Sequence, residues 1–334
     1  MSRIAPEPLI LMPTSRTPSR LSRREVLQQA TALIAGAAVG AGRLQGQQRA
    51  GDTTRFFPGF QSFKTDGAGA VINGVIGGQG PPLLLLHGAP QTHVVWHSVA
   101  PQLAANYTVV ATDLRGYGDS SKPPDGENHA SYSKRATGID QVQVMRHFGF
   151  ERFALIGCDR GARVAHRMAI DHPDNITSLV LIDIVPTHYL FAHCNLTFVQ
   201  TYYNWFQKMR PAPLPENELK IAYDQQKARA TSEIQLEYLR TSTDPANIHA
   251  MCEDYRAAAS IDLEHDEADL GKKIPCPLLV LLGEKSPLCK PYDVPAIWRQ
   301  RAANVTVKSL PGGHELQVDV PDLFLAEVRG FLNG

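Results

Sequence analysis

Residues 153–163, Phe-Ala-Leu-Ile-Gly-Cys-Asp-Arg-Gly-Ala-Arg, carry the clearest structural signal in this sequence. The apolar run 153–156 has the length and composition of a strand covered on both faces, and a helical pattern follows the second glycine. Asp159 stands midway between the two glycines, whose small size permits a tight turn that lifts the central side chain out of the sheet. The stretch therefore predicts a strand, a sharp turn that presents Asp159, and a helix. An aspartate that only caps the helix is the alternative.

Strand-like and helix-like segments alternate on both sides of this stretch. Runs typical of strands occupy residues 71–76, 82–86, 107–111, 153–156, 179–182, 278–282 and 305–309. Helical patterns occupy residues 94–104, 131–148, 161–171, 294–303 and 322–331. Such alternation predicts an α/β fold with a mainly parallel sheet and helices on both faces.

Residues 186–275 interrupt the alternation, because they contain no convincing buried strand. They carry amphipathic segments at 197–209, 216–227, 234–241 and 245–258. Ligands of parallel α/β sheets bind at the carboxyl ends of the strands. We therefore expect a helical lid, inserted into one domain that spans residues 51–334, to cover a site at that edge.

Two further motifs follow predicted strands. Leu310-Pro-Gly-Gly-His314 comes after the last strand, and Leu86-His-Gly-Ala-Pro90 comes after an early one. A central elbow, a histidine after the last strand and an early loop that supplies a backbone amide are the parts of the α/β-hydrolase fold. We accordingly expect His314 to be the general base, and the N–H groups of Ala89 and Arg160 to form the oxyanion hole.

An aspartate at the elbow, in place of serine, narrows the chemistry. Its carboxylate is ionised at neutral pH and suits displacement at a saturated carbon, which leaves an ester on Asp159. His314 would then activate the water that hydrolyses this ester. Carbon–halogen hydrolysis and epoxide opening both use this scheme, and a catalytically silent receptor on the same fold is a third reading.

The chain resembles the haloacetate (fluoroacetate) dehalogenases from about Phe56 to its C-terminus. The resemblance rests on residues 114–118, 159–163, 166–169, 172–174, 183–187, 254–256 and 310–314. It implies hydrolysis of the carbon–halogen bond of a short 2-haloacid, with no cofactor. The sequence shows no paired His/Cys motif for zinc and no calcium-loop spacing, so no metal is expected.

Arg160 and Arg163 are three residues apart at the start of the predicted helix and therefore share one face. Both lie at the positive end of the helix dipole, beside Asp159. Guanidinium groups bind carboxylates in a bidentate manner, so this pair predicts a site for the substrate carboxylate. The alternative is that both arginines pair with acids of the protein.

The resemblance also implies the remaining site residues. Asp183 matches the acid that orients His314, although Glu284, after the next strand, is an alternative. Trp205 and Tyr255 match the donors to the leaving halide. Asn204 stands where the family has histidine, and Ala89 where it has a bulky aromatic residue. Since asparagine cannot become cationic, we expect chloroacetate or bromoacetate to be turned over faster than fluoroacetate.

The first fifty residues differ in composition from the rest. They hold seven arginines, no lysine and two glutamates. Arg23 and Arg24 precede an Ala/Gly-rich apolar run at 26–42, which is the pattern of a twin-arginine export signal. The run is too short and diluted for a stable membrane span. We expect a periplasmic or secreted protein; a disordered tail on a cytoplasmic protein is the alternative.

Overall composition excludes several classes of protein. The 334 residues have zero formal net charge and 43% hydrophobic residues, which is unlike a disordered chain. Five cysteines are too few, and odd in number, for a disulfide-dense scaffold. The absence of a basic excess argues against a nucleic-acid partner. The expected partner is a small haloacid, and the sequence leaves a homodimer open.

Overall fold

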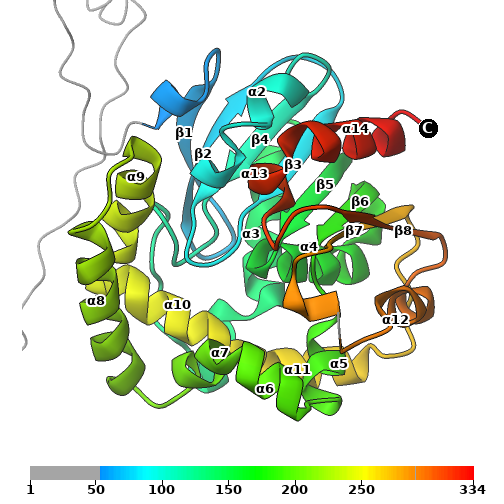
Figure 1. Cartoon of the computed structure of the whole chain (residues 1–334). Coiled ribbons are helices and arrows are strands. Elements are labelled where there is room, and N and C mark those ends of the chain that lie inside the picture. Colours follow the sequence, from blue (N-terminus) through cyan, green and yellow to red (C-terminus); the bar gives the residue numbers. More distant parts are fainter. Residues whose placement is uncertain (1–52, 290) are drawn as a thin grey trace, which may run out of the picture. The chain divides into compact units, whose positions relative to one another are not determined.

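The computed structural model describes residues 53–289 and 291–334, so the predicted leader at 1–50 lies outside the described residues. The strands form one eight-stranded sheet in the order β1-β2-β4-β3-β5-β6-β7-β8 (Figure 1). They are β1 (Gln61–Asp66), β2 (Val71–Gly77), β3 (Pro82–Leu86), β4 (Thr108–Thr112), β5 (Phe153–Cys158), β6 (Ile176–Ile182), β7 (Leu278–Gly283) and β8 (Val305–Leu310). β1 and β2 pair antiparallel, and the sheet is parallel from β4 to β8. The predicted mainly parallel sheet is confirmed.

β1 is the strand that the sequence did not reveal. Its residues Gln-Ser-Phe-Lys-Thr-Asp are mostly polar, and all but Thr65 are at least partly exposed. An edge strand pairs on one side only and does not need a continuous apolar run. It forms because β2 offers a complete antiparallel register from Gln61 opposite Ile76 to Asp66 opposite Val71.

Helices cover both faces of the sheet, because successive strand residues point to opposite sides. Leu84, Leu155 and Leu181 belong to one buried cluster, with α3 (Lys134–His147), α4 (Arg160–Asp171) and α12 (Val294–Arg301). Leu85, Ile156 and Ile182 belong to the other, with α2 (Ala100–Leu103), α13 (Leu316–Asp319) and α14 (Pro321–Leu332). The two cores pack against opposite faces of the sheet and fix the positions of its strand ends.

Two predicted helices are wrong in extent. The helix expected at 94–104 is divided into a 3₁₀ helix, η2 (His93–Trp96), and the short α2, which has Pro101 in its first turn. The helix expected at 131–148 begins later, at Lys134, because the Ser133 side chain accepts the Ala136 N–H as an N-cap. The 3₁₀ helix η3 (Glu127–Tyr132) precedes it. Other 3₁₀ helices are η1 (Thr54–Phe56), η4 (Pro173–Asn175) and η5 (Pro287–Cys289).

The region between β6 and β7 is helical. It contains α5 (Thr187–Ala192), α6 (Leu196–Thr201), α7 (Tyr203–Lys208), α8 (Leu214–Lys227), α9 (Glu233–Ser242), α10 (Pro245–Ala258) and α11 (Ile261–Ala268). The single helix expected at 197–209 is two helices separated at Tyr202, and α5 and α11 were not expected. Labels α5, α6, α7 and α11 lie along the lower edge of Figure 1.

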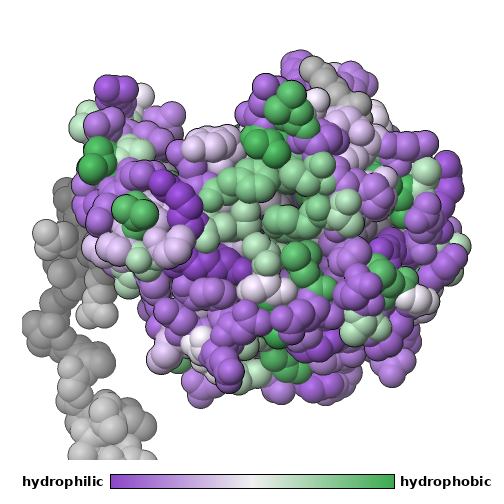
Figure 2. All heavy atoms as spheres, turned by 90° about the horizontal axis from the view of Figure 1, so that it is seen from below, coloured by the Kyte–Doolittle hydropathy of each residue, from purple (hydrophilic) through white to green (hydrophobic). Residues whose placement is uncertain are grey.

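Figure 2 views the molecule from this lower side, where hydrophobic residues gather in the middle of the face and hydrophilic residues surround them. Leu196 on α6 and Tyr203 on α7 are among the large hydrophobic residues that are exposed. None of the helices in the described part of the chain combines the length and apolarity needed to cross a bilayer.

Candidate active site

The turn between β5 and α4 presents Asp159 in a strained conformation. Asp159 has φ 46° and ψ −114°, in a region that residues with a side chain rarely adopt. The turn packs tightly against the end of β3: a Cβ on Gly161 would lie 2.4 Å from the carbonyl oxygens of Leu86 and His87. Only glycine fits at this position, so the sequence Gly-Cys-Asp-Arg-Gly forces the Asp159 side chain toward the neighbouring strand ends.

The loop after β3 holds one oxygen of this carboxylate. The Ala89 N–H donates to Asp159 Oδ2 over 3.3 Å. Arg160, the other residue expected to form the oxyanion hole, is the first residue of α4, where backbone N–H groups have no partner within the helix.

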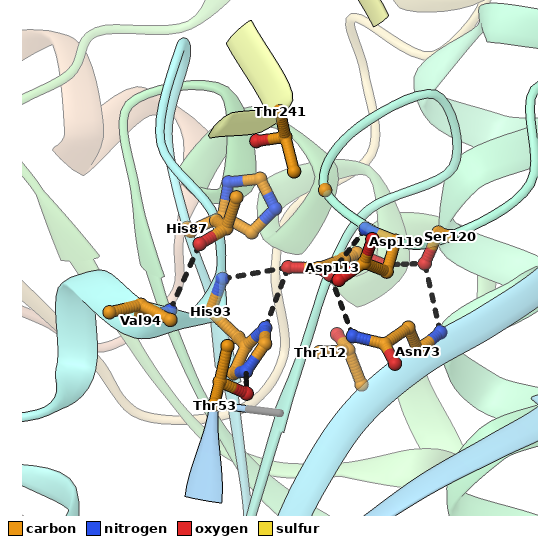
Figure 3. Close-up of polar contacts among 12 residues, drawn as sticks. Thr53, Asn73, His87, His93, Val94, Thr112, Asp113, Asp119, Ser120 and Thr241 are labelled. Atoms are coloured by element: carbon orange, nitrogen blue, oxygen red, sulfur yellow. Dashed lines mark hydrogen bonds and ion pairs between the residues drawn. The ribbon is translucent and has the colours of Figure 1, made fainter. Parts of the chain in front are cut away.

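Buried polar contacts fix the loop after β3 to the loop after β4 (Figure 3). The His87 ring donates from Nδ1 to the Gly88 carbonyl at 2.7 Å and accepts the Leu114 N–H at Nε2 over 3.0 Å. Burial lowers the pKa of His87, which keeps the ring neutral and able to accept. Asp113 accepts the backbone N–H of His93 at 2.9 Å and its ring Nδ1–H at 2.8 Å. These contacts leave the Ala89 amide little freedom to move.

His314 and Asp183 meet at the ends of β8 and β6. His314 Nδ1 lies 2.5 Å from Asp183 Oδ2, and Asp183 is fully buried. Asp183 also accepts the Gly283 N–H at 3.1 Å and the Ser286 hydroxyl at 2.6 Å. Glu284, the alternative partner, is exposed. The geometry thus favours Asp183 as the residue that orients His314.

The other ring nitrogen of His314 faces Asp159, with Nε2 4.0 Å from Oδ1. Burial lowers the pKa of His314, but the hydrogen bond with Asp183 and the charges of Asp159 and Asp183 outweigh burial. The pKa therefore lies above its ordinary value of 6.5. A gap of 4.0 Å between Nε2 and Oδ1 is too long for a hydrogen bond but leaves the histidine close to the carboxylate.

The two arginines have different surroundings, which corrects the expectation of one shared role. Arg160 is fully buried and donates from Nε to Asp254 Oδ2 at 2.6 Å and from Nη2 to the Asp254 carbonyl at 2.8 Å. Lys134 binds the same carboxylate. Burial would raise the pKa of Asp254, but these two cations lower it below its ordinary value. Arg160 is thus paired with an acid of the protein.

Arg163 has no carboxylate partner within the described residues. Its Nη1 donates to the Val185 carbonyl and to the Thr187 hydroxyl, both at 3.0 Å. Burial and the charge of Arg160 lower the pKa of Arg163 to about 10, so that it stays charged at neutral pH. Its Nε and the Nη1 of Arg160 are buried, and neither has a hydrogen-bond partner among the residues that the structure describes. These two N–H groups are free to donate to an acceptor that enters the site.

Trp205 on α7 and Tyr255 on α10 place their rings edge to face, with centroids 5.4 Å apart. The guanidinium carbon of Arg163 lies 4.7 Å from the Trp205 ring centroid, and that of Arg160 lies 4.3 Å from the Tyr255 centroid. Both aromatic side chains are nearly buried, whereas Asn204 beside Trp205 is exposed. The aromatic pair therefore contacts the two arginines that follow Asp159 at the start of α4.

A cavity of about 370 Å³ unites these parts. Of the predicted site residues, its lining includes Ala89, Asp159, Arg163, Asp183, Asn204, Trp205, Tyr255 and His314. Arg160 is not in the lining, and neither is Glu284. Residues from four strand ends and from the inserted helices thus face one chamber.

Sequence reasoning missed three contributors to this site: Lys208, Asp254 and Ser286. Lys208 lines the cavity, Asp254 neutralises Arg160, and Ser286 binds Asp183. Lys208 could have been found, since it is three residues after Trp205 on one helix and therefore shares its face. Asp254 belongs to the motif at 254–256, but neither its role nor that of Ser286 could be assigned from the sequence, because their partners are distant in the chain.

Comparison with protein families matches residues 81–321 to a family described as alpha/beta hydrolase fold. A fluoroacetate dehalogenase from Burkholderia sp is 43% identical over 289 residues, which cover 83% of this chain and 95% of the relative. Epoxide hydrolase 4 of Mus musculus is 29% identical over 279 residues, covering 77% of this chain and 74% of the relative.

A solved structure gives a similar picture. A mutant of a Pseudomonas aeruginosa protein described as an epoxide hydrolase, with bound MFA, superposes with a TM-score of 0.76 at 40% identity. The match covers 83% of this chain and 97% of that protein. The similar proteins thus carry both dehalogenase and epoxide hydrolase names.

Proposed function

This chain belongs to the alpha/beta hydrolase family, and we propose that it hydrolyses the carbon–halogen bond of short 2-haloacids through an ester on Asp159. One observation carries the proposal: the Asp159 carboxylate at the elbow lines the same cavity as the Arg163 guanidinium, which has no acidic partner in the described part of the chain. The carboxylate supplies a nucleophile, and the guanidinium supplies a partner for the carboxylate of the substrate. The 43% identity to a fluoroacetate dehalogenase supports the same reading.

In the first step, Asp159 displaces the halide. Oδ2 stays with the Ala89 N–H, so Oδ1 is the free oxygen that attacks the carbon bearing the halogen. The new carbon–oxygen bond forms as the carbon–halogen bond breaks, and the halide leaves with the bonding electron pair. Arg163 holds the substrate carboxylate, and Trp205, Tyr255 and Asn204, which line the same cavity, donate to the departing halide.

In the second step, water hydrolyses the ester. His314 Nε2 takes a proton from a water molecule whose oxygen attacks the Asp159 carbonyl carbon. The N–H groups of Ala89 and Arg160 stabilise the negative charge on the carbonyl oxygen. The bond between this carbon and Oδ1 then breaks, and Oδ1 leaves as the hydroxyl oxygen of the 2-hydroxyacid, with the proton that His314 had taken from water. The carboxyl group of Asp159 now carries the oxygen of the water and loses its proton to solvent. Asp183 accepts from His314 Nδ1 throughout and stabilises the imidazolium that forms.

Epoxide hydrolysis is the second candidate, favoured by the names of several relatives. It would use the same Asp159 and His314, with Tyr255 as the acid that protonates the opening ring. A simple epoxide offers nothing to the charged Arg163, which is why we place haloacids first. A receptor without activity is the third candidate, and the assembled Asp159, His314 and Asp183 argue against it.

One assay separates these functions. We expect the purified protein to release halide from chloroacetate or bromoacetate, with one hydroxyacid formed for each halide. Asp159→Asn should abolish release while the protein stays folded, since the amide is not a nucleophile of comparable strength. Diol formation from neutral epoxides without halide release would favour the second candidate, and no turnover of either class would favour the third.

A further inference from the structure

Lys208 is a cavity residue that the mechanism above does not use. It is the last residue of α7, its side chain is 7% exposed, and it lines the same cavity as Asp159. A lysine so well buried normally has a paired acid. Its role therefore needs an explanation.

No carboxylate of the described chain lies within ion-pair distance of this ammonium group. Its polar contacts are the Asn204 carbonyl oxygen, 3.4 Å from Nζ, and the face of Tyr255, whose ring centroid is 4.9 Å from Nζ. Burial lowers the pKa of Lys208, while the charge of Asp159 acts in the opposite direction. An ammonium group has three N–H donors. A single long hydrogen bond leaves most of that capacity for a ligand.

The helix directs this ammonium toward the leaving-group residues. Side chains on a helix lean toward its N-terminus, and residues three and four apart lie one above the other. Lys208 follows Asn204 by four residues and Trp205 by three, so its side chain runs back over the turn that carries them. The contacts with the Asn204 carbonyl and the Tyr255 ring agree with this direction.

The charged and titratable residues that line the cavity indicate what Lys208 does. They are Asp159, Arg163, Asp183, His314 and Lys208. In the proposed complex, His314 is hydrogen-bonded to Asp183, and Arg163 binds the carboxylate of the substrate. During displacement the negative charge of Asp159 moves to the halide, and Lys208 is the remaining cation of this lining. The substrate carboxylate thus balances the charge of Arg163, and Lys208 is left to balance the charge that passes from Asp159 to the halide.

We propose that Lys208 is a further catalytic residue, whose ammonium group holds the departing halide together with Trp205 and Tyr255. This role rests on the proposed dehalogenase function. Lys208 donates hydrogen bonds and keeps its proton: the electron pair of the carbon–halogen bond leaves with the halide, and Asp159 becomes a neutral ester. Fluoride is the smallest halide and the strongest hydrogen-bond acceptor, so it depends most on a cationic donor. Lys208 thus supplies the positive charge that Asn204 cannot.

The test compares ester formation from fluoroacetate and bromoacetate, in a His314→Gln background that retains the ester for detection by intact mass. Lys208→Met removes the charge and keeps the length of the side chain. We expect it to slow ester formation from fluoroacetate by about 10- to 150-fold, the usual cost of a hydrogen bond to a charged group. Ester formation from bromoacetate should fall much less, and Lys208→Arg should restore part of the loss.

Lys220→Met on α8 is the matched control, since the Lys220 side chain is 40% exposed and pairs with Asp224. It should behave as the parent protein does. Lys208→Gln is measured in parallel, so that the role of Lys208 can still be tested if the Lys208→Met variant does not fold. Unchanged rates, or equal losses with both haloacids, would overturn the role of Lys208. Absence of halide release by the otherwise unmodified protein would instead refute the dehalogenase function itself.

Discussion

Arg160 and Arg163 share one helix face but differ in what their charges meet. Arg160 is fully buried and is neutralised by Asp254, which also binds Lys134. Arg163 meets a carbonyl, a hydroxyl and an aromatic ring but, among the described residues, no acid. At the scale of single residues, Arg163 is therefore suited to bind the substrate, whereas Arg160 ties α10 to the elbow through Asp254.

Replacing each arginine by leucine should separate these roles. Arg163→Leu should lower kcat/KM for bromoacetate by about 10- to 150-fold, or about 1.5–3 kcal/mol, because a charge-assisted contact is lost. The uncharged analogue 2-bromoacetamide should be affected far less. Arg160→Leu should instead lower the free energy of unfolding by about 3–5 kcal/mol, because it leaves Asp254 with an incomplete set of partners. Steady-state kinetics and chemical denaturation measure the two effects; equal losses for both bromo compounds would make Arg163 structural.

The strand ends hold the site together at the scale of elements. β3, β5, β6 and β8 each deliver one part: the Ala89 amide, Asp159, Asp183 and His314 follow these strands in turn. Their mutual positions depend on the approach of α4 to β3, which Gly161 makes possible. A side chain at this glycine would push the elbow away from the Ala89 loop.

Gly161→Ala should therefore destabilise the protein by about 3 kcal/mol, because the methyl group would overlap the backbone oxygens of Leu86, at the end of β3, and of His87 just after it. Gly330→Ala on α14 is the matched control, since a Cβ there meets no atom within 4 Å. It should stabilise the helix by about 0.5–1 kcal/mol. Thermal or chemical unfolding of the two variants compares them, and similar stabilities would show that the elbow adapts to a larger residue.

At the scale of the whole molecule, the sequence was enough to predict those strands and helices that a local pattern of apolar residues determines. Short apolar runs reveal buried parallel strands, so seven strands were expected near their observed positions, whereas the polar edge strand β1 was missed. The short α2 shows the limit for helices: periodicity across residues 94–104 is continuous, but Thr92 and Pro101 start two separate elements.

The residues of the candidate site likewise fall into those that the sequence could predict and those that it could not. Asp159 and His314 follow strands, and parallel strand ends converge at one edge, so their meeting could be foreseen. The pairing of Arg160 with Asp254 depends on where α10 packs, 94 residues further along the chain, and no local pattern encodes that distance. Lys208 follows Trp205 by three residues, so the sequence alone could have placed both on one helix face. Its burial beside Tyr255 is a product of tertiary packing alone.

The central claim is that Asp159 forms a covalent ester, and a single turnover in heavy-oxygen water tests it most directly. The protein, in excess over bromoacetate, is allowed one turnover, and a peptide containing Asp159 is then weighed by mass spectrometry. The account predicts that the label enters the Asp159 carboxylate, because water attacks its carbonyl carbon, and that the hydroxyacid formed in that turnover is unlabelled. Label found directly in the hydroxyacid, with Asp159 unlabelled, would show that water attacks the substrate and would contradict the account.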